Sequence, residues 1–192
     1  ITRAPGTWVR TVAGIEAALG AGLRVGLNCV IDGRNADAVA ALGAFVVDRF
    51  VRPFPDNPVE SMTLSRAQPF HDRALWEAGR LPLDRLRPGV LAASQMLAAA
   101  GVVVDVTSGS CGLPACVLDG APALIYLPAA EHLGDADPGF DNADRAETAC
   151  GRCALRRRCQ GPGPGYAEAF GDRGLRPFET LPQIAEGFPL TL

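Results

Sequence analysis

Three cysteines lie close together near the C-terminal end of this chain, and they constrain its fold more than any other feature. Cys150, Cys153 and Cys159 have C-x2-C-x5-C spacing, and Cys116 precedes them by 33 intervening residues. Four thiolates complete the coordination of a tetrahedral metal ion or of an iron–sulfur cluster. The pattern therefore predicts a metal centre that draws two distant segments of the chain together.

The residues around these cysteines suit an anionic centre. The run that contains them also holds four arginines, and positive charge lowers the pKa of nearby thiols. Glycines at 161, 163 and 165 allow tight backbone turns around a bound group. The residues alone leave three interpretations open: thiols that are merely buried, a zinc site with four cysteine ligands, and a four-iron cluster.

The distribution of cysteines and charges narrows the class of protein. Five of the six cysteines follow residue 110, which favours a metal site over disulfides spread through the chain. All 18 basic residues are arginine and the net charge is -3, so composition gives no case for binding nucleic acid or an anionic membrane. No apolar run is long enough to span a membrane, and no signal peptide is visible. We expect a cytoplasmic protein without nucleic-acid or membrane partners.

Apolar periodicity in the first half of the chain predicts helices that alternate with strands. Thr7 is the predicted N-cap of the first helix and Asn35 that of the second. We expect a loop and a short helix near Leu64–Trp76. The remaining predicted segments are a helix over 8–19, a strand over 23–31, a helix over 36–46, a strand over 50–54, a helix over 85–100 and a strand over 102–106. This order indicates an α/β fold with a parallel sheet, whose ligands collect at the carboxyl ends of the strands.

The texture of the sequence changes after Ser108, where Gly, Pro and Cys become frequent and apolar runs shorten. We therefore expect two domains, an α/β domain over 1–108 and a small, irregular, cysteine-rich domain over 109–192. Within the second, Ala121–Leu127 is a candidate strand and Glu131–Thr148 reads as a polar surface loop.

The cysteine region resembles a known family. The pattern Cys150-x2-Cys153-Ala-Leu-x3-Cys159-x-Gly-x4-Tyr166-x3-Phe-Gly resembles the C-terminal signature of radical S-adenosylmethionine (SAM) enzymes with an auxiliary iron–sulfur domain of the SPASM/Twitch type. The segment Gly112-x-Pro-x-Cys116 is similar to the upstream single-cysteine motif of that domain. Residues 14–35 are similar to a helix–strand–Asn-helix segment of the radical SAM partial barrel. The resemblance implies that residues 1–108 are part of a parallel, partial (β/α)6 TIM-like barrel and that 109–192 bind an auxiliary [4Fe-4S] cluster.

Two departures from the family pattern limit what the resemblance implies. Such enzymes carry a CxxxCxxC motif whose cysteines bind the cluster that cleaves SAM, and this chain has none. The fuller pattern also continues with another cysteine three residues after the last, whereas Gln160-Gly161-Pro162-Gly163 follows Cys159 here. We therefore expect the C-terminal portion of a longer enzyme, with one auxiliary cluster on Cys116, Cys150, Cys153 and Cys159.

The resemblance also implies a function for the complete enzyme. It would be an oxidoreductase or maturase that uses SAM and a second [4Fe-4S] cluster, acts on a peptide or protein substrate and receives electrons from a donor protein. This portion alone is expected to be inactive. Two alternatives from other classes stay open: a zinc-binding structural or interaction module with a four-cysteine site, and a cluster-bearing domain that binds a leader peptide without chemistry.

Several single residues carry narrower expectations. Asn28 and Arg52 are candidates for contact with SAM or substrate from strand ends. Cys111 is a spare thiol, an alternative cluster ligand or a catalytic donor. Cys29 is expected in the core, because a free cysteine packs as a small hydrophobe. Tyr166 is expected to pack over the cluster loop and shield it from water.

Overall fold

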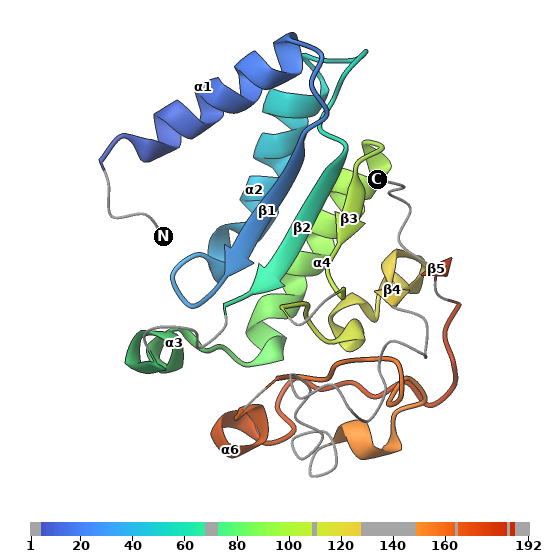
Figure 1. Cartoon of the computed structure of the whole chain (residues 1–192). Coiled ribbons are helices and arrows are strands. Elements are labelled where there is room, and N and C mark those ends of the chain that lie inside the picture. The colour runs from blue at the N-terminus through green and yellow to red at the C-terminus, as the bar shows by residue number, and fades with distance from the viewer. Residues whose placement is uncertain are drawn as a thin grey trace.

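The structure is a computed structural model, and it describes residues 5–67, 73–108, 111–127, 149–163, 165–183 and 185–186. The chain has a mixed α/β fold built on a three-stranded sheet in the order β1-β2-β3. The strands are β1 (Gly26–Ile31), β2 (Ser61–Arg66) and β3 (Val103–Asp105), and both pairings are parallel. The sheet formed by these strands is open and does not close into a barrel (Figure 1). The surface loop predicted over Glu131–Thr148 lies outside the described residues.

Two helices cover one face of this sheet, namely α2 (Val39–Val46) and α4 (Leu83–Ala99) (Figure 1). The short 3-10 turn η1 (Ala36–Ala38) leads into α2, and the π-helical turn η2 (Val47–Val51) continues it. Gly43 of α2 is buried against Ala93 of α4, where an added Cβ would lie 3.0 Å from the Ala93 backbone. A glycine is therefore what lets these helices approach closely.

Alternation along the strands gives the sheet two different faces. Because successive side chains point to opposite sides, the register that pairs Asn28 with Thr63 and Thr63 with Asp105 puts these polar residues on one face. The neighbouring positions Met62, Leu64 and Val104 are at most 2 % exposed and belong to the core under the helices. The sheet thus has an apolar face under α2 and α4 and a polar face that no described helix covers (Figure 1).

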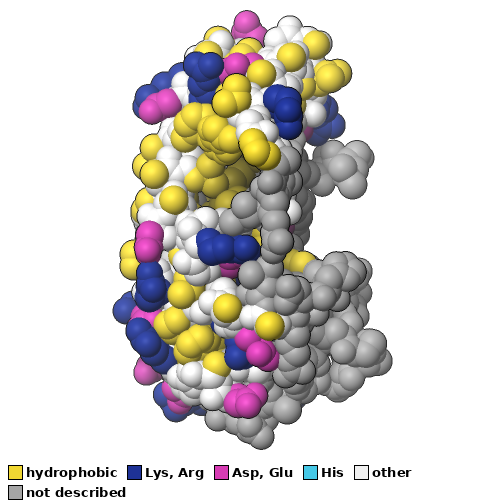
Figure 2. Space-filling model, turned by 90° about the vertical axis from the view of Figure 1, so that its left-hand side faces the viewer, with side chains coloured by type: hydrophobic (Ala, Val, Ile, Leu, Met, Phe, Trp, Pro, Cys, Tyr) yellow, Lys and Arg dark blue, Asp and Glu magenta, His cyan; other side chains and the backbone are white. Residues whose placement is uncertain are grey.

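Helix α1 (Thr7–Gly20) lies at the edge of the domain, beyond α2 (Figure 1). It packs Trp8 on Phe45, with ring centroids 5.2 Å apart, and Glu16 forms an ion pair with Arg49. Trp8 nevertheless stays 58 % exposed and Val9 69 % exposed. Figure 2 shows hydrophobic side chains gathered over the upper half of this side of the molecule. None of the described helices is long and apolar enough to cross a membrane.

The prediction of a strand over 50–54 was wrong, and the second strand is instead β2. Phe50 continues the buried helical face of α2 through η2, where Val46, Val47 and Phe50 are all buried. β2 was missed because its polar residues, such as Ser61 and Ser65, alternate with apolar ones over only six positions. The predicted helix near Leu64–Trp76 begins later, as α3 (Arg73–Gly79), because Leu64 is in the strand.

The first and third helices and the outer strands lie where periodicity placed them, but their caps differ. Gly6, with a φ of 72°, is the N-cap of α1 in place of Thr7, which is the first helical residue. Asn35 precedes η1 but makes no cap hydrogen bond to it. Its side chain instead donates to the Val30 carbonyl at 2.8 Å and accepts from the Asp32 N–H at 2.9 Å, which fixes the turn after β1.

The cysteine-rich part of the chain lies below the carboxyl ends of the strands (Figure 1). Its elements are η3 (Ala115–Leu118), η4 (Pro122–Leu124), β4 (Tyr126–Leu127), η6 (Ala149–Arg152), α6 (Tyr166–Phe170) and β5 (Ala185–Glu186). Only the last two residues of the predicted strand over Ala121–Leu127 belong to a strand; they form β4, which pairs with β5 in parallel. Buried residues of this part, including Val117, Leu155 and Tyr166, belong to the same hydrophobic core as those under the sheet.

Candidate metal centre

The four predicted ligands line a single pocket, which we call the thiol pocket. Cys116 reaches it from η3, Cys150 from η6, and Cys153 and Cys159 from the turns that follow. The other lining residues are Pro114, Ala115, Leu155, Arg156, Gly161, Leu175, Arg176, Pro177 and Phe178. Two segments that are distant in sequence therefore meet at one cavity, and all four predicted ligands line it.

Short hydrogen-bonded turns bring the last three cysteines to the same side. The Cys153 N–H donates to the Cys150 carbonyl at 3.1 Å, which closes the C-x2-C segment into one turn. The Cys159 N–H donates to the Leu155 carbonyl at 2.9 Å, which returns the chain to the pocket. Leu155, only 1 % exposed, anchors this second turn in the core. The x5 spacing thus amounts to a second turn around one buried apolar side chain.

Cys116 is held by a rigid and buried segment. Pro114 precedes η3 in an extended conformation, and all four residues of η3 are buried. The opposite side of η3 packs on α4, where the Arg87 guanidinium donates from Nε to the Cys116 carbonyl at 3.2 Å. The cysteine-rich part therefore contributes Cys116 from a segment that is held on α4, and the other three ligands from residues 149–159.

Backbone N–H groups point at three of the sulfurs. Cys159 Sγ accepts from the N–H groups of Ala115 and Gly161, both at 3.4 Å, and Cys153 Sγ accepts from that of Phe178 at 3.3 Å. The backbone N–H of Arg176 donates to the Cys116 thiol. Hydrogen bonds to the charged form stabilise a thiolate, as they do in four-cysteine metal sites.

Burial is the main reason that the pKa of the Cys116 thiol is raised to about 12; the neighbouring Cys159 and Cys150 act in the same direction, and the Arg176 N–H and the Arg87 charge act against it. At neutral pH the metal-free thiol therefore keeps its proton. A metal ion that binds there must displace that proton, so metal affinity is expected to rise with pH.

The donor set fits a tetrathiolate centre. All six cysteines are free, so none of the four is committed to a disulfide. Among the described residues, no three His, Cys, Asp or Glu side chains are already gathered closely enough to hold a metal ion. The fit rests on chemistry: four sulfurs on one pocket, N–H donors aimed at three of them, and no competing oxygen ligand among the lining residues. Both zinc and an iron–sulfur cluster accept such a set.

The basis for the Arg52 prediction was wrong, because Arg52 does not end a strand. It follows η2 near the amino end of β2, where the Val59 N–H donates to the Phe50 carbonyl. There its exposed side chain forms an ion pair with Asp48, four residues earlier. The amino end of the sheet is the end opposite the thiol pocket. The structure therefore gives no support for one ligand that contacts both Arg52 and the thiol pocket.

Asn28 and Cys111 lie elsewhere in the molecule than the thiol pocket. Asn28 is on the polar face of the sheet, where its Oδ1 accepts from Ser65 Oγ at 3.1 Å. The Cys111 carbonyl accepts from the Arg66 N–H at 2.8 Å, which extends the end of β2, and Cys111 is not among the pocket-lining residues. The ligand role of Asn28 and the three roles open to Cys111 stay predictions. Cys29 packs against the core, half-buried, on the helix-covered face of β1.

Tyr166 is buried as expected, but its role differs from the prediction. It does not line the thiol pocket. Its hydroxyl accepts a hydrogen bond from the Leu83 N–H at 2.9 Å and donates one to the Arg173 carbonyl. The ring lies on Phe170, with centroids 5.1 Å apart. Tyr166 therefore joins the cysteine-rich part to the first residue of α4.

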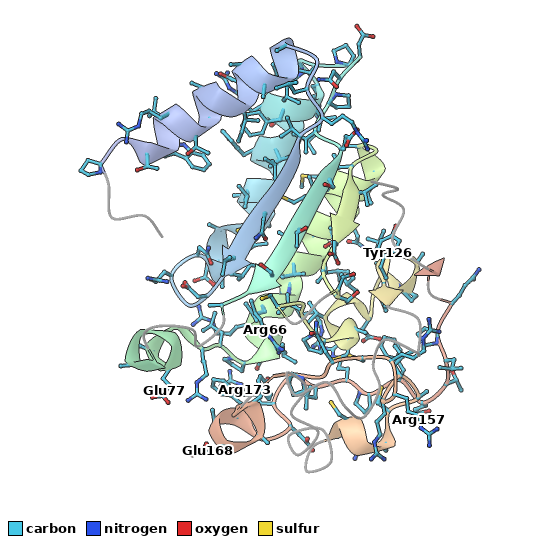
Figure 3. All side chains as sticks on the ribbon, viewed as in Figure 1. Arg66, Glu77, Tyr126, Arg157, Glu168 and Arg173 are labelled. Carbon is cyan, nitrogen blue, oxygen red and sulfur yellow. The ribbon has the colours of Figure 1, made fainter. Side chains whose placement is uncertain are left out.

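A loop of alternating glycine and proline docks the cysteine-rich part on the strand ends. A Cβ at Gly163 would lie 2.1 Å from Arg66 Nη1, and Arg80 Nη1 donates to the Gly165 carbonyl at 3.1 Å. Figure 3 shows Arg66 between the sheet and this part, while Arg157 lies at its outer edge. The glycine spacing in the sequence predicts tight turns around a bound group; in the structure, Gly163 and Gly165 also let the loop approach Arg66 and Arg80 closely.

No family model, curated protein or solved structure matches the chain. The class of protein is therefore inferred from the site itself: a small α/β fold that carries a four-cysteine pocket at the carboxyl ends of its parallel strands.

Proposed function

We propose that Cys116, Cys150, Cys153 and Cys159 hold one [4Fe-4S] cluster. One observation carries this proposal: four thiols from two distant segments line one pocket, with backbone N–H donors on three of them. The apolar lining residues Leu155 and Phe178 exclude water, which protects a cluster from hydrolysis and modulates its potential.

We further propose that the chain is the C-terminal portion of a radical SAM oxidoreductase or maturase that modifies a peptide or protein. The sequence resemblance supports this reading, and so do the two faces of the sheet. Asn28, Thr63 and Asp105 form a polar face opposite the helices, as the inner wall of a partial (β/α)6 barrel would. The exposed side chains of Trp8 and Val9 on α1 support further barrel segments packing there.

In that enzyme, SAM and a second cluster bound by other residues would supply the radical, and a donor protein would supply electrons. With all four irons held by cysteine, the auxiliary cluster would supply an electron acceptor next to the strand ends. This chain's own contribution is structural and electrostatic. The docked loop, with Arg66 against Gly163 and Arg80 on Gly165, holds the cluster domain against the edge where ligands of parallel sheets collect.

Metal analysis of anaerobically purified protein tests the cluster. About four iron atoms and four sulfides per chain are expected, with broad charge-transfer absorption in the visible range. Cys153→Ser should abolish iron binding, whereas Cys29→Ser, outside the thiol pocket, should retain it. Full iron loading of Cys153→Ser would refute the ligand set.

A zinc-bound structural module is the second candidate. It is favoured by the closed set of four cysteine ligands, since structural zinc sites are four-coordinate and leave no open position. One zinc per chain without iron or sulfide would establish this reading and exclude the cluster.

A further inference from the structure

Arg87 is a buried cation in the inner face of α4. Arg87 is only 7 % exposed, and it lies beside Leu86 and one turn from Val90, which are both in the core. Within the described part of the chain, no carboxylate lies at ion-pair distance from it. A buried charge without a counter-charge strongly destabilises a fold, so a guanidinium here needs an anionic neighbour.

The donors of Arg87 lead to the walls of the thiol pocket. Nε donates to the carbonyl of Cys116, and Nη2 donates to the carbonyl of Gly174. Gly174 directly precedes Leu175 and Arg176, which line the pocket. Both acceptors are neutral, so these hydrogen bonds orient the guanidinium without cancelling its charge.

Other cations near the thiols are placed less favourably. Arg152, Arg156 and Arg157 are exposed, where solvent and salt screen their charge. Arg176 lines the pocket, but its guanidinium forms an ion pair with Asp119 at 3.3 Å. Arg158, beside Cys159, is partly exposed. Arg87 is thus the most buried of these arginines, so solvent screens its charge least.

We propose that Arg87 is the counter-charge of the thiolate centre and a positioning residue for Cys116. The inference rests on the proposed function only in requiring a tetrathiolate centre. A divalent ion or a four-iron cluster with four thiolates is a net anion, and Arg87 stabilises it in either case. A cation beside a cluster also favours its reduced, more negative state, so Arg87 raises the reduction potential.

Binding of Co²⁺ to the metal-free protein tests this without reliance on the native metal, because tetrathiolate cobalt has a characteristic visible spectrum. Removing an outer-shell partner typically weakens metal binding by about 10- to 100-fold, and we expect that loss for Arg87→Met and Arg87→Gln. Arg87→Lys, which keeps the charge, should recover most of the affinity. Arg85→Met is the matched control, since Arg85 is on the same helix but pairs with Asp37 at the surface.

The outcomes separate this inference from the proposed function. A wild-type protein that gives no tetrathiolate spectrum would refute the centre itself. If Arg87→Met binds Co²⁺ as tightly as wild type does, the role of the Arg87 charge is refuted but the metal centre is not. The same holds if Arg87→Lys and Arg87→Met lose equal Co²⁺ affinity. That role is also refuted if the uncharged variants fail to fold without metal, because Arg87 would then be needed by the metal-free fold. For a cluster-loaded protein, a tenfold shift in the reduction equilibrium of Arg87→Met appears as a potential about 59 mV more negative.

Discussion

Replacing Tyr166 by Phe removes one hydroxyl and tests how firmly the cysteine-rich part is joined to the α/β part. The ring and its contact with Phe170 are kept, so the change isolates two hydrogen bonds. The hydroxyl accepts from the Leu83 N–H, at the first residue of α4, and donates to the Arg173 carbonyl. The first N–H groups of a helix have no partner within the helix, so Tyr166 does for α4 what an N-cap side chain normally does.

The expected cost follows from these two bonds. A buried donor left without a partner costs about 1–3 kcal/mol, and the second lost bond adds about 0.5–1.5 kcal/mol. We therefore expect the free energy of unfolding to fall by about 1.5–4.5 kcal/mol. For a chain of this size each kcal/mol lowers the melting temperature by roughly 2–4 °C, so the melting temperature should fall by about 3–18 °C.

Denaturant unfolding of metal-free protein, followed by circular dichroism, measures this change. The matched control is Asp84→Asn, which removes a neighbouring exposed ion pair with Arg173 and should leave the unfolding midpoint almost unchanged. A Tyr166→Phe protein within about 0.5 kcal/mol of wild type would show that water replaces the hydroxyl, and that α4 does not depend on this cap.

Three further predictions concern the burial of Leu155, the protonation of Cys116 and the crowding around Gly112. Leu155→Ala should cost about 2–5 kcal/mol of stability in a thermal or denaturant melt, because Leu155 is only 1 % exposed. The control is Leu181→Ala, which should leave stability unchanged because Leu181 is 67 % exposed. Equal losses in the two variants would contradict the shared core. Because burial raises the folded-state pKa of Cys116 to about 12, the metal-free native state binds this proton more tightly than the unfolded chain, so its contribution to stability is complete below about pH 9 and is lost as the pH rises toward 12. Cys116→Ser should remove that alkaline loss in unfolding curves at pH 8 and 10, and parallel losses in both proteins would count against it. Gly112→Ala should destabilise the protein, since its Cβ would lie 2.7 Å from the Thr107 backbone and 2.2 Å from Gln160 Nε2; a melt as stable as wild type would disprove the crowding.

The docking of the cysteine-rich part explains why a change in one part should be felt in the other. Gln160 donates from Nε2 to the Thr107 carbonyl at 3.2 Å, beyond the end of β3, and the Leu113 N–H donates to the Val106 carbonyl at 2.7 Å. The segment after Cys159 is thereby held to the same strand end that leads to Cys116. If the metal centre forms as proposed, its binding energy stabilises both parts of the fold.

The sequence by itself determined the features that depend on near neighbours. Helical spacing located α1 and α4, because apolar periodicity depends only on residues that lie within a few helical turns of one another. The C-x2-C-x5-C spacing singled out Cys150, Cys153 and Cys159 for the same reason, and the structure places them on one pocket with Cys116. The helical spacing also places one charged residue, Arg87, in the apolar stripe of α4 formed by Leu83, Leu86 and Val90. A charge at such a position in the sequence indicates a buried residue with a special role.

Only the tertiary structure decided the rest. β2 is a strand because β1 and β3 pair with it on both sides, although its alternating polar residues looked like a loop. Whether Tyr166 covers the cluster loop or caps α4 depends on contacts across 83 positions of the chain. The sequence gives no spacing rule for such pairs, because loops of many lengths can close them at nearly equal entropic cost. The four cysteines are therefore a local pattern, while the pocket that collects them is a product of long-range packing.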